Sequence, residues 1–211
     1  MTGQEPVTEH GATEPREAPR ALTGRNLVVV SGPSGAGKTT VCRKVAKRLG
    51  VLVSVSATTR PRRSGEVDGT DYQFIGAEEF RRRIDQGRFV EWAEVFGQLY
   101  GTPLEELVRA EEAGNVLLLE IDVQGGIRIK KRFPDVLAVL LLAPGLEALR
   151  RRLSLRGTEG QEEAERRFAE AQEEIEMARR AGCYDVEVVN DRLDDAVEKV
   201  IELVEMRRNQ T

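Results

Sequence analysis

Residues 32–39 constrain the fold of this chain more than any other segment. They read GPSGAGKT and fit the pattern G-x-x-x-x-G-K-[ST]. The apolar run at 26–31 before them is typical of a buried strand, and the pattern at 38–49 is typical of a helix. In such a loop, glycines let consecutive backbone N–H groups point inward toward an anion at the start of the helix. The segment therefore predicts an α/β fold with a phosphate-binding loop after its first strand.

Apolar runs without alternation recur along the rest of the chain. Runs of this kind suit parallel strands that are covered on both faces. We expect five strands, at 26–31, 52–56, 116–122, 136–142 and 186–190. Helical patterns fall among them, at 38–49, 124–133, 146–153, 161–181 and 193–206. This alternation predicts a doubly wound, parallel five-stranded sheet flanked by helices.

Residues 57–102 break the rhythm of strand and helix. The segment is polar, carries Ser-Gly and Asp-Gly turn signals, and contains the only tryptophan of the chain. We expect an inserted mixed α/β lobe with short strands and one helix near 77–86, between core segments 24–56 and 103–208. Because the lobe concentrates aromatic, arginine and carboxylate side chains, it is a candidate substrate site.

The first 23 residues differ from everything that follows. They hold few large apolar side chains and many Glu, Thr, Gly and Pro residues. Such a segment buries too little apolar surface to offset the entropy lost on ordering. We expect 1–23 to be a disordered leader and 24–208 to form one domain.

Composition argues against several classes of function. The net charge of −4 argues against a chain-wide electrostatic grip on nucleic acid, and no apolar run approaches the length of a membrane span. The single histidine, His10, leaves no basis for a histidine-based triad or a histidine-cluster zinc site. Two cysteines without metal-ligand spacing, and no secretory signal, indicate a cytoplasmic protein.

The phosphate loop indicates a nucleoside triphosphate as ligand. Lys38 would neutralise the β- and γ-phosphates, and the Thr39 hydroxyl would face Mg²⁺. Asp122 follows the strand at 116–122 and suits a role in holding Mg²⁺ or its water. The sequence from Asp122 to Gly125 also mimics the D-x-x-G of GTPases, but we find no N/T-K-x-D to read guanine in that system, which disfavours a GTPase.

A second set of residues suits a phosphorylated guanine nucleotide. Arg60 and Arg63 lie three residues apart, and with Tyr72 they can clamp a second phosphate, because guanidinium forks match phosphate oxygens. Glu91 can accept two hydrogen bonds from the N1–H and the 2-amino group of guanine. A buried carboxylate left unpaired by the wrong base is costly, so such a site rejects competitors.

Several linked motifs resemble those of guanylate kinase, over nearly all of 26–206. They occur in the order GPSGAGKTT, SATTRPRRSGEVDGTDY, FVEWAEVFG, YGTP, IDVQG, RRLSLRGTEG and VNDRLD. The resemblance implies ATP-dependent phosphorylation of GMP and dGMP with Mg²⁺. It also implies a mobile GMP-binding lobe at about 57–102 and a helical lid at about 150–168.

The resemblance also assigns roles to individual residues. The ATP side comprises Gly32, Pro33, Ser34, Gly35, Ala36, Gly37, Lys38, Thr39, Thr40 and, toward adenine, Asn190. On the GMP side, Arg60, Arg63, Tyr72 and Tyr100 contact the phosphate, and Ser56, Glu91 and Thr102 contact guanine. Glu120 and Asp122 lie near the phosphates, with Thr39 and Asp122 toward Mg²⁺. The catalytic set is Lys38, Arg152, Arg156 and Arg167.

Three features depart from the family pattern, one of them the order Pro61-Arg62, which is inverted against the usual order. Two rival functions stay open. Glu120 stands where Asp is common, and Leu99 stands where an aromatic side chain often precedes the phosphate-binding tyrosine. One rival is a catalytically inactive guanylate-kinase-like module that binds proteins, which Lys38 and Thr39 disfavour. The other is a P-loop kinase of another phosphorylated small molecule, which Glu91 disfavours. We expect ATP, GMP and dGMP as partners, no nucleic acid or membrane, and a monomer or small homo-oligomer.

Overall fold

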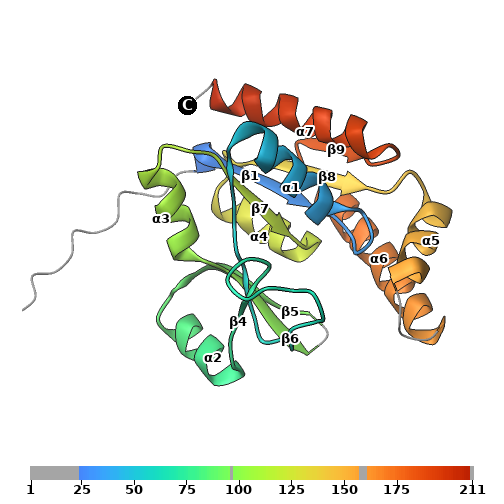
Figure 1. Ribbon diagram of the computed structural model, residues 1–211, viewed down its shortest axis with the longest axis horizontal. Coiled ribbons are helices and arrows are strands. Elements are labelled where there is room, and N and C mark those ends of the chain that lie inside the picture. The colour runs from blue at the N-terminus through green and yellow to red at the C-terminus, as the bar shows by residue number, and fades with distance from the viewer. Residues whose placement is uncertain (1–23, 96, 157–160, 210–211) are drawn as a thin grey trace, which may run out of the picture.

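A five-stranded parallel sheet lies at the centre of the computed structural model, which describes residues 24–95, 97–156 and 161–209 (Figure 1). The predicted leader at 1–23 lies outside these residues. In spatial order the strands are β2 (Leu52–Val53), β7 (Leu117–Ile121), β1 (Leu27–Ser31), β8 (Leu137–Leu142) and β9 (Val186–Val189), and every pair is parallel. The predicted doubly wound sheet is confirmed, although β2 is shorter than the strand expected at 52–56.

The central strands β1, β7 and β8 are mainly apolar because both faces of the sheet are covered there. In β1, Val28 and Val30 belong to a core cluster shared with α1 (Lys38–Leu49) and α7 (Leu193–Arg208). Leu27 and Val29 point to the opposite cluster, which includes residues of α3 (Leu104–Glu112) and α4 (Val123–Arg132). Successive side chains of a strand point to opposite faces, so a strand buried on both faces shows no alternation in its sequence.

Helix α3 is an element that the sequence analysis did not predict. Only Glu106, Leu107 and Ala110 of its residues are buried, so its apolar stripe is short. Two glutamates in its first turn, Glu105 and Glu106, suit the positive end of the helix dipole. The helix carries the chain from the lobe back to the central sheet.

The inserted lobe has a sheet and a small core of its own. The strands lie in the order β4 (Gln73–Phe74), β3 (Ala57–Thr58), β6 (Gln98–Pro103) and β5 (Phe89–Val95). The helix expected near 77–86 is α2 (Ala77–Asp85), whose Phe80 stacks on Phe89 with ring centroids 4.4 Å apart. Leu99 joins this cluster, so the departure at that position serves packing.

Two further helices lie beside the phosphate loop (Figure 1). They are α5 (Leu146–Arg156) and α6 (Gln161–Ala181), and they share a small cluster with Leu149, Leu153 and Ala171 at its centre. Part of the predicted lid, residues 157–160, lies outside the described residues. None of the described helices is long and apolar enough to cross a membrane.

Candidate functional site

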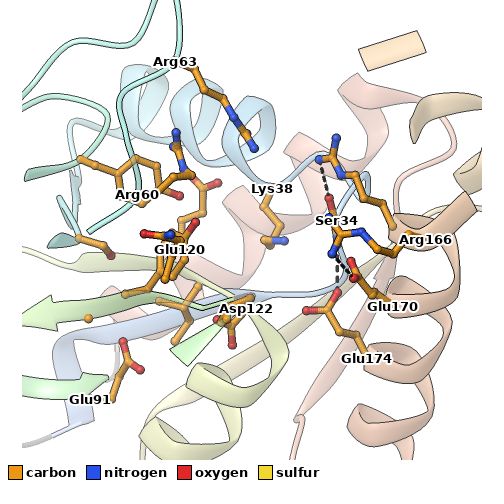
Figure 2. Close-up of a pocket in the computed structure, with 18 residues that line it drawn as sticks. Ser34, Lys38, Arg60, Arg63, Glu91, Glu120, Asp122, Arg166, Glu170 and Glu174 are labelled. Carbon is orange, nitrogen blue, oxygen red and sulfur yellow. Dashed lines mark hydrogen bonds and ion pairs between the residues drawn. The ribbon is translucent and has the colours of Figure 1, made fainter. Parts of the chain in front are cut away.

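A cavity of about 320 Å³ lies between the carboxyl ends of the central strands and the inserted lobe (Figure 2). It brings together most of the side chains predicted from the sequence, namely Ser34, Lys38, Ser56, Arg60, Arg63, Tyr72, Glu91, Tyr100, Glu120, Asp122 and Arg167. Its lining also includes residues that the sequence analysis did not single out, namely Val95, Gln98, Gly101, Ile121, Arg166, Glu170 and Glu174. The cavity therefore joins the phosphate loop to the predicted guanine and phosphate contacts.

The phosphate loop needs glycine where it passes closest to the sheet. Gly32 has a φ of +152°, and a Cβ atom there would clash with the carbonyl oxygen of Leu141. The Lys38 ammonium donates to the carbonyl oxygens of Gly32 and Pro33, at 2.6 and 3.1 Å. The side chain is thus held at the mouth of the loop beside the N-terminus of α1, where an anion is favoured.

Oxygen ligands gather at the ends of β1 and β7. The Thr39 hydroxyl donates to the carboxylate of Glu120. Asp122 caps α4, because its Oδ1 accepts from the backbone N–H of Gly125 at 2.7 Å. Among the described residues no group of three or more His, Cys, Asp or Glu forms a metal cluster. Such sparse oxygen ligands suit Mg²⁺, which is usually bound by one or two carboxylates together with substrate phosphates.

Arg60 is held in position by a carboxylate that the sequence analysis missed. Its Nη1 and Nη2 donate to the two carboxylate oxygens of Glu66 at 3.1 and 2.7 Å. The backbone N–H of Arg63 donates to the same carboxylate at 2.7 Å. Burial acts to raise the pKa of Glu66, but these hydrogen bonds lower it below its usual value. Glu66 therefore stays charged and fixes the loop that carries both arginines.

Two phenols complete this side of the cavity. The rings of Tyr72 and Tyr100 meet edge to face with centroids 6.0 Å apart, and the Arg60 guanidinium lies 5.5 Å from the centre of the Tyr72 ring. Burial, followed by the charge of Glu120, raises the pKa of Tyr72 to about 12. Tyr72 therefore keeps its proton at neutral pH and can donate a hydrogen bond to an anion.

Glu91 carries a buried carboxylate at the opposite end of the cavity. Its side chain is 7% exposed, and its Oε1 accepts from the hydroxyl of Thr102 at 2.9 Å. Burial raises the pKa of Glu91 to about 7, and the Thr102 hydrogen bond acts in the opposite direction. Thr102 itself is fully buried and does not line the cavity, so the structure places it behind Glu91.

Four further residues of the predicted ATP side, Gly35, Gly37, Thr40 and Asn190, lie around a second hollow. This hollow of about 290 Å³ is lined by Gly35, Gly37, Thr40, Arg152, Asn190, Asp191 and Leu193. Arg152 donates to the backbone carbonyl of Asn190 at 2.7 Å, and the Asn190 amide donates to the carbonyl of Ala36 at 2.8 Å. The structure thus separates Arg152 from Arg167, which belongs to the main cavity.

Helix α6 presents charged side chains to the phosphate loop (Figure 2). Arg167 donates to the Ser34 hydroxyl at 3.3 Å, and the Ser34 N–H donates to Glu174 at 3.2 Å. Burial raises the pKa of Glu174, although the charge of Lys38 opposes this. The spacing of 167, 170 and 174 along one helix face is a signal that could have identified Glu170 and Glu174. The side chain of Arg156 lies outside what the structure describes.

Comparisons with known proteins agree with this geometry. The family profile described as guanylate kinase matches residues 24–207. The chain belongs to the guanylate kinase family. Curated guanylate kinases of Caldanaerobacter subterraneus subsp. tengcongensis and Rubrobacter xylanophilus are 46% and 48% identical to it. These alignments cover 82% and 86% of this chain, and 84% and 93% of the relatives.

A solved structure supports the same assignment. The crystal structure of guanylate kinase from Anaplasma phagocytophilum superposes with a TM-score of 0.71 at 31% identity. It covers 86% of this chain, and this chain covers 85% of it. The chain is thus an enzyme of the nucleoside monophosphate kinase class, as its linked motifs implied.

Proposed function

We propose that this chain transfers the γ-phosphoryl group of ATP to GMP, and to dGMP, with Mg²⁺ as cofactor. One observation carries the proposal. A single cavity joins Lys38 of the phosphate loop to the Arg60 and Tyr72 side chains and to Glu91. The cavity thus offers positively charged groups for two phosphate-bearing nucleotides. It also offers a carboxylate that can accept two hydrogen bonds from a base.

The lobe supplies the proposed GMP contacts. Arg60, Arg63, Tyr72 and Tyr100 provide N–H and O–H donors for the GMP phosphate. Ser56 and Glu91 face guanine, and Thr102 acts through its hydrogen bond to Glu91. An ionised Glu91 accepts from both the N1–H and the 2-amino group of guanine, whereas adenine offers no such pair of donors.

The core supplies the proposed ATP contacts. The loop residues 32–40 and Lys38 bind the phosphates, and the hollow beside Asn190 receives the adenine end. The oxygen ligands of Thr39, Glu120 and Asp122 fit Mg²⁺, since the Thr39 hydroxyl and the Glu120 carboxylate are already in contact. These side chains would hold Mg²⁺, which when bound would supply positive charge beside the phosphates.

Catalysis in this scheme depends on position and charge. Two anionic nucleotides repel each other, and the arginines at 60 and 63 hold one while the phosphate loop holds the other. Lys38 and Arg167 line the main cavity and would cover the charge on the transferred group, with Arg152 and Arg156 brought to it by closure of the lid, so no strong base is required. We place the mobile parts at the described residues of the lobe, 57–95 and 97–102, and of the predicted lid, 150–156 and 161–168. Their closure would exclude the water that otherwise hydrolyses ATP.

The proposal is tested by an ADP-release assay with ATP and Mg²⁺. GMP, dGMP, AMP, CMP and UMP are offered separately to the wild type and to Glu91→Gln. The matched control is Glu94→Gln, because Glu94 is an exposed glutamate of the same strand. We expect turnover with GMP and dGMP alone, a higher KM for GMP in Glu91→Gln, and no change in the control. Equal turnover of AMP and GMP would refute the proposed guanine contact.

A further inference from the structure

Arg128 of α4 lies next to Glu91 of β5, on the side of that strand that faces α4. Its Nε is 3.9 Å from Oε2 of Glu91. Both Nε and Nη2 of Arg128 are buried and have no hydrogen-bond partner among the described residues. Buried guanidinium nitrogens without partners are costly, so their position beside a buried carboxylate calls for an explanation.

The second oxygen of Glu91 is confined by the backbone of the same helix. A Cβ atom on Gly125 would lie 3.2 Å from Oε2, tighter than an ordinary contact, so the absence of a side chain there lets the carboxylate approach α4. On the other side, Thr102 of β6 holds Oε1 at 2.9 Å. The carboxylate of Glu91 is therefore fixed between a hydroxyl on β6 and the Arg128 guanidinium on α4.

We propose that Arg128 is a positioning residue for guanine recognition, whose guanidinium holds the Glu91 carboxylate beside α4 and oriented toward the base. The inference rests on the proposed role of Glu91 as the guanine contact. Arg128 lies outside the family motifs and does not line the main cavity. The proposal therefore adds a residue outside the cavity to the guanine site.

The charges around Glu91 support this role. Burial raises the pKa of Glu91 most, and the negative charge of Asp122 raises it further. The Thr102 hydrogen bond and the positive charge of Arg128 both lower it. On the same helix, Arg132 donates to the carbonyl of Val90, the residue before Glu91 on β5. Arg128 is thus the cation that offsets burial and Asp122.

The test compares KM for GMP between the wild type and Arg128→Met across pH 6 to 8.5. Loss of a charge about 4 Å away, partly exposed to solvent, raises the pKa of Glu91 by about one unit. About half of the Glu91 side chains are ionised at pH 7 in the wild type, and about one tenth in the variant. We therefore expect KM for GMP to rise about fivefold at pH 7 and to differ by less than about 1.5-fold at pH 8.5.

Three controls separate this effect from a loss of packing. Arg128→Lys keeps a positive charge at this position and should restore most of the wild-type profile. Lys131→Met removes an exposed charge from the same helix and should leave the profile unchanged. KM for ATP should stay constant in all variants. Titration of the GMP phosphate affects every enzyme alike, so it cancels in the ratio of KM values.

A direct measurement needs no substrate. The side-chain carboxyl ¹³C signal of Glu91, assigned with Glu91→Gln in the full chain, should titrate about one pH unit higher in Arg128→Met. An unmoved midpoint, or a KM ratio that is the same at every pH, would overturn the proposal. A wild-type KM for GMP in Glu91→Gln would instead remove the guanine contact itself, and the role of Arg128 in recognition with it.

Discussion

Replacing Thr102 with valine tests whether guanine recognition depends on a hydroxyl that does not line the cavity. Valine has nearly the shape of threonine, so the change removes a donor without opening a cavity. The lost hydrogen bond joins a fully buried hydroxyl to a carboxylate that is 7% exposed, at 2.9 Å. Hydrogen bonds to charged groups contribute about 1.5–3 kcal/mol, which corresponds to a factor of about 10 to 150.

We therefore expect Thr102→Val to raise KM for GMP by about 10- to 150-fold at pH 7, with little change in KM for ATP. Steady-state kinetics with each substrate varied in turn measure both values. Thr102→Ser keeps a hydroxyl and should recover most of the affinity. If KM for GMP stays within about twofold of wild type, or if both KM values rise together, Thr102 does not act through Glu91.

The remaining predictions concern charge, pH and the phosphate loop. Lys38→Met should lower kcat by about 100-fold or more, because the Lys38 ammonium lies at the mouth of the loop. The affinity for GMP, measured by calorimetry, should persist, and a kcat near wild type would contradict the assigned role. KM for GMP should rise as pH falls below about 7, because Glu91 has a pKa of about 7 and only its ionised form accepts both hydrogen bonds from guanine. A KM that does not change with pH in steady-state assays would contradict this role of Glu91. Gly32→Ala should lower the free energy of unfolding by about 2–4 kcal/mol in urea titrations, because its Cβ would meet the Leu141 carbonyl. Gly114→Ala, which has a φ of +58° but an open surrounding, should cost about 1 kcal/mol, and equal losses would contradict the clash.

The central sheet was predictable because its strands are buried on both faces. Burial on both faces leaves apolar runs such as the first three residues of β7 and the whole of β8. Helix α3 escaped prediction because only three of its residues are buried, which leaves a weak periodic signal. The edge strand β2 pairs over two residues only, so its expected length was too great.

The site was predictable where a motif fixes the chemistry, as in the phosphate loop. Roles that depend on which residues meet in the folded chain could not be predicted from the sequence. Glu66 matters because the chain folds back to place it on Arg60, and Arg128 matters because α4 packs behind β5. Likewise, no pattern along the chain could show that Arg152 and Arg167 lie around different hollows.

Because the Ser34 N–H donates to Glu174, a carboxylate of the protein itself already occupies one donor of the phosphate loop. A backbone N–H donates well to one acceptor, so any phosphate oxygen that takes this donor must replace the carboxylate. A phosphate that binds in the loop therefore replaces the Glu174 carboxylate at this donor. Loss of the Ser34–Glu174 contact reduces the free energy gained by the phosphate. The released carboxylate sits on α6, the helix that also carries Arg167, so filling the loop changes the charge balance of the helix beside it.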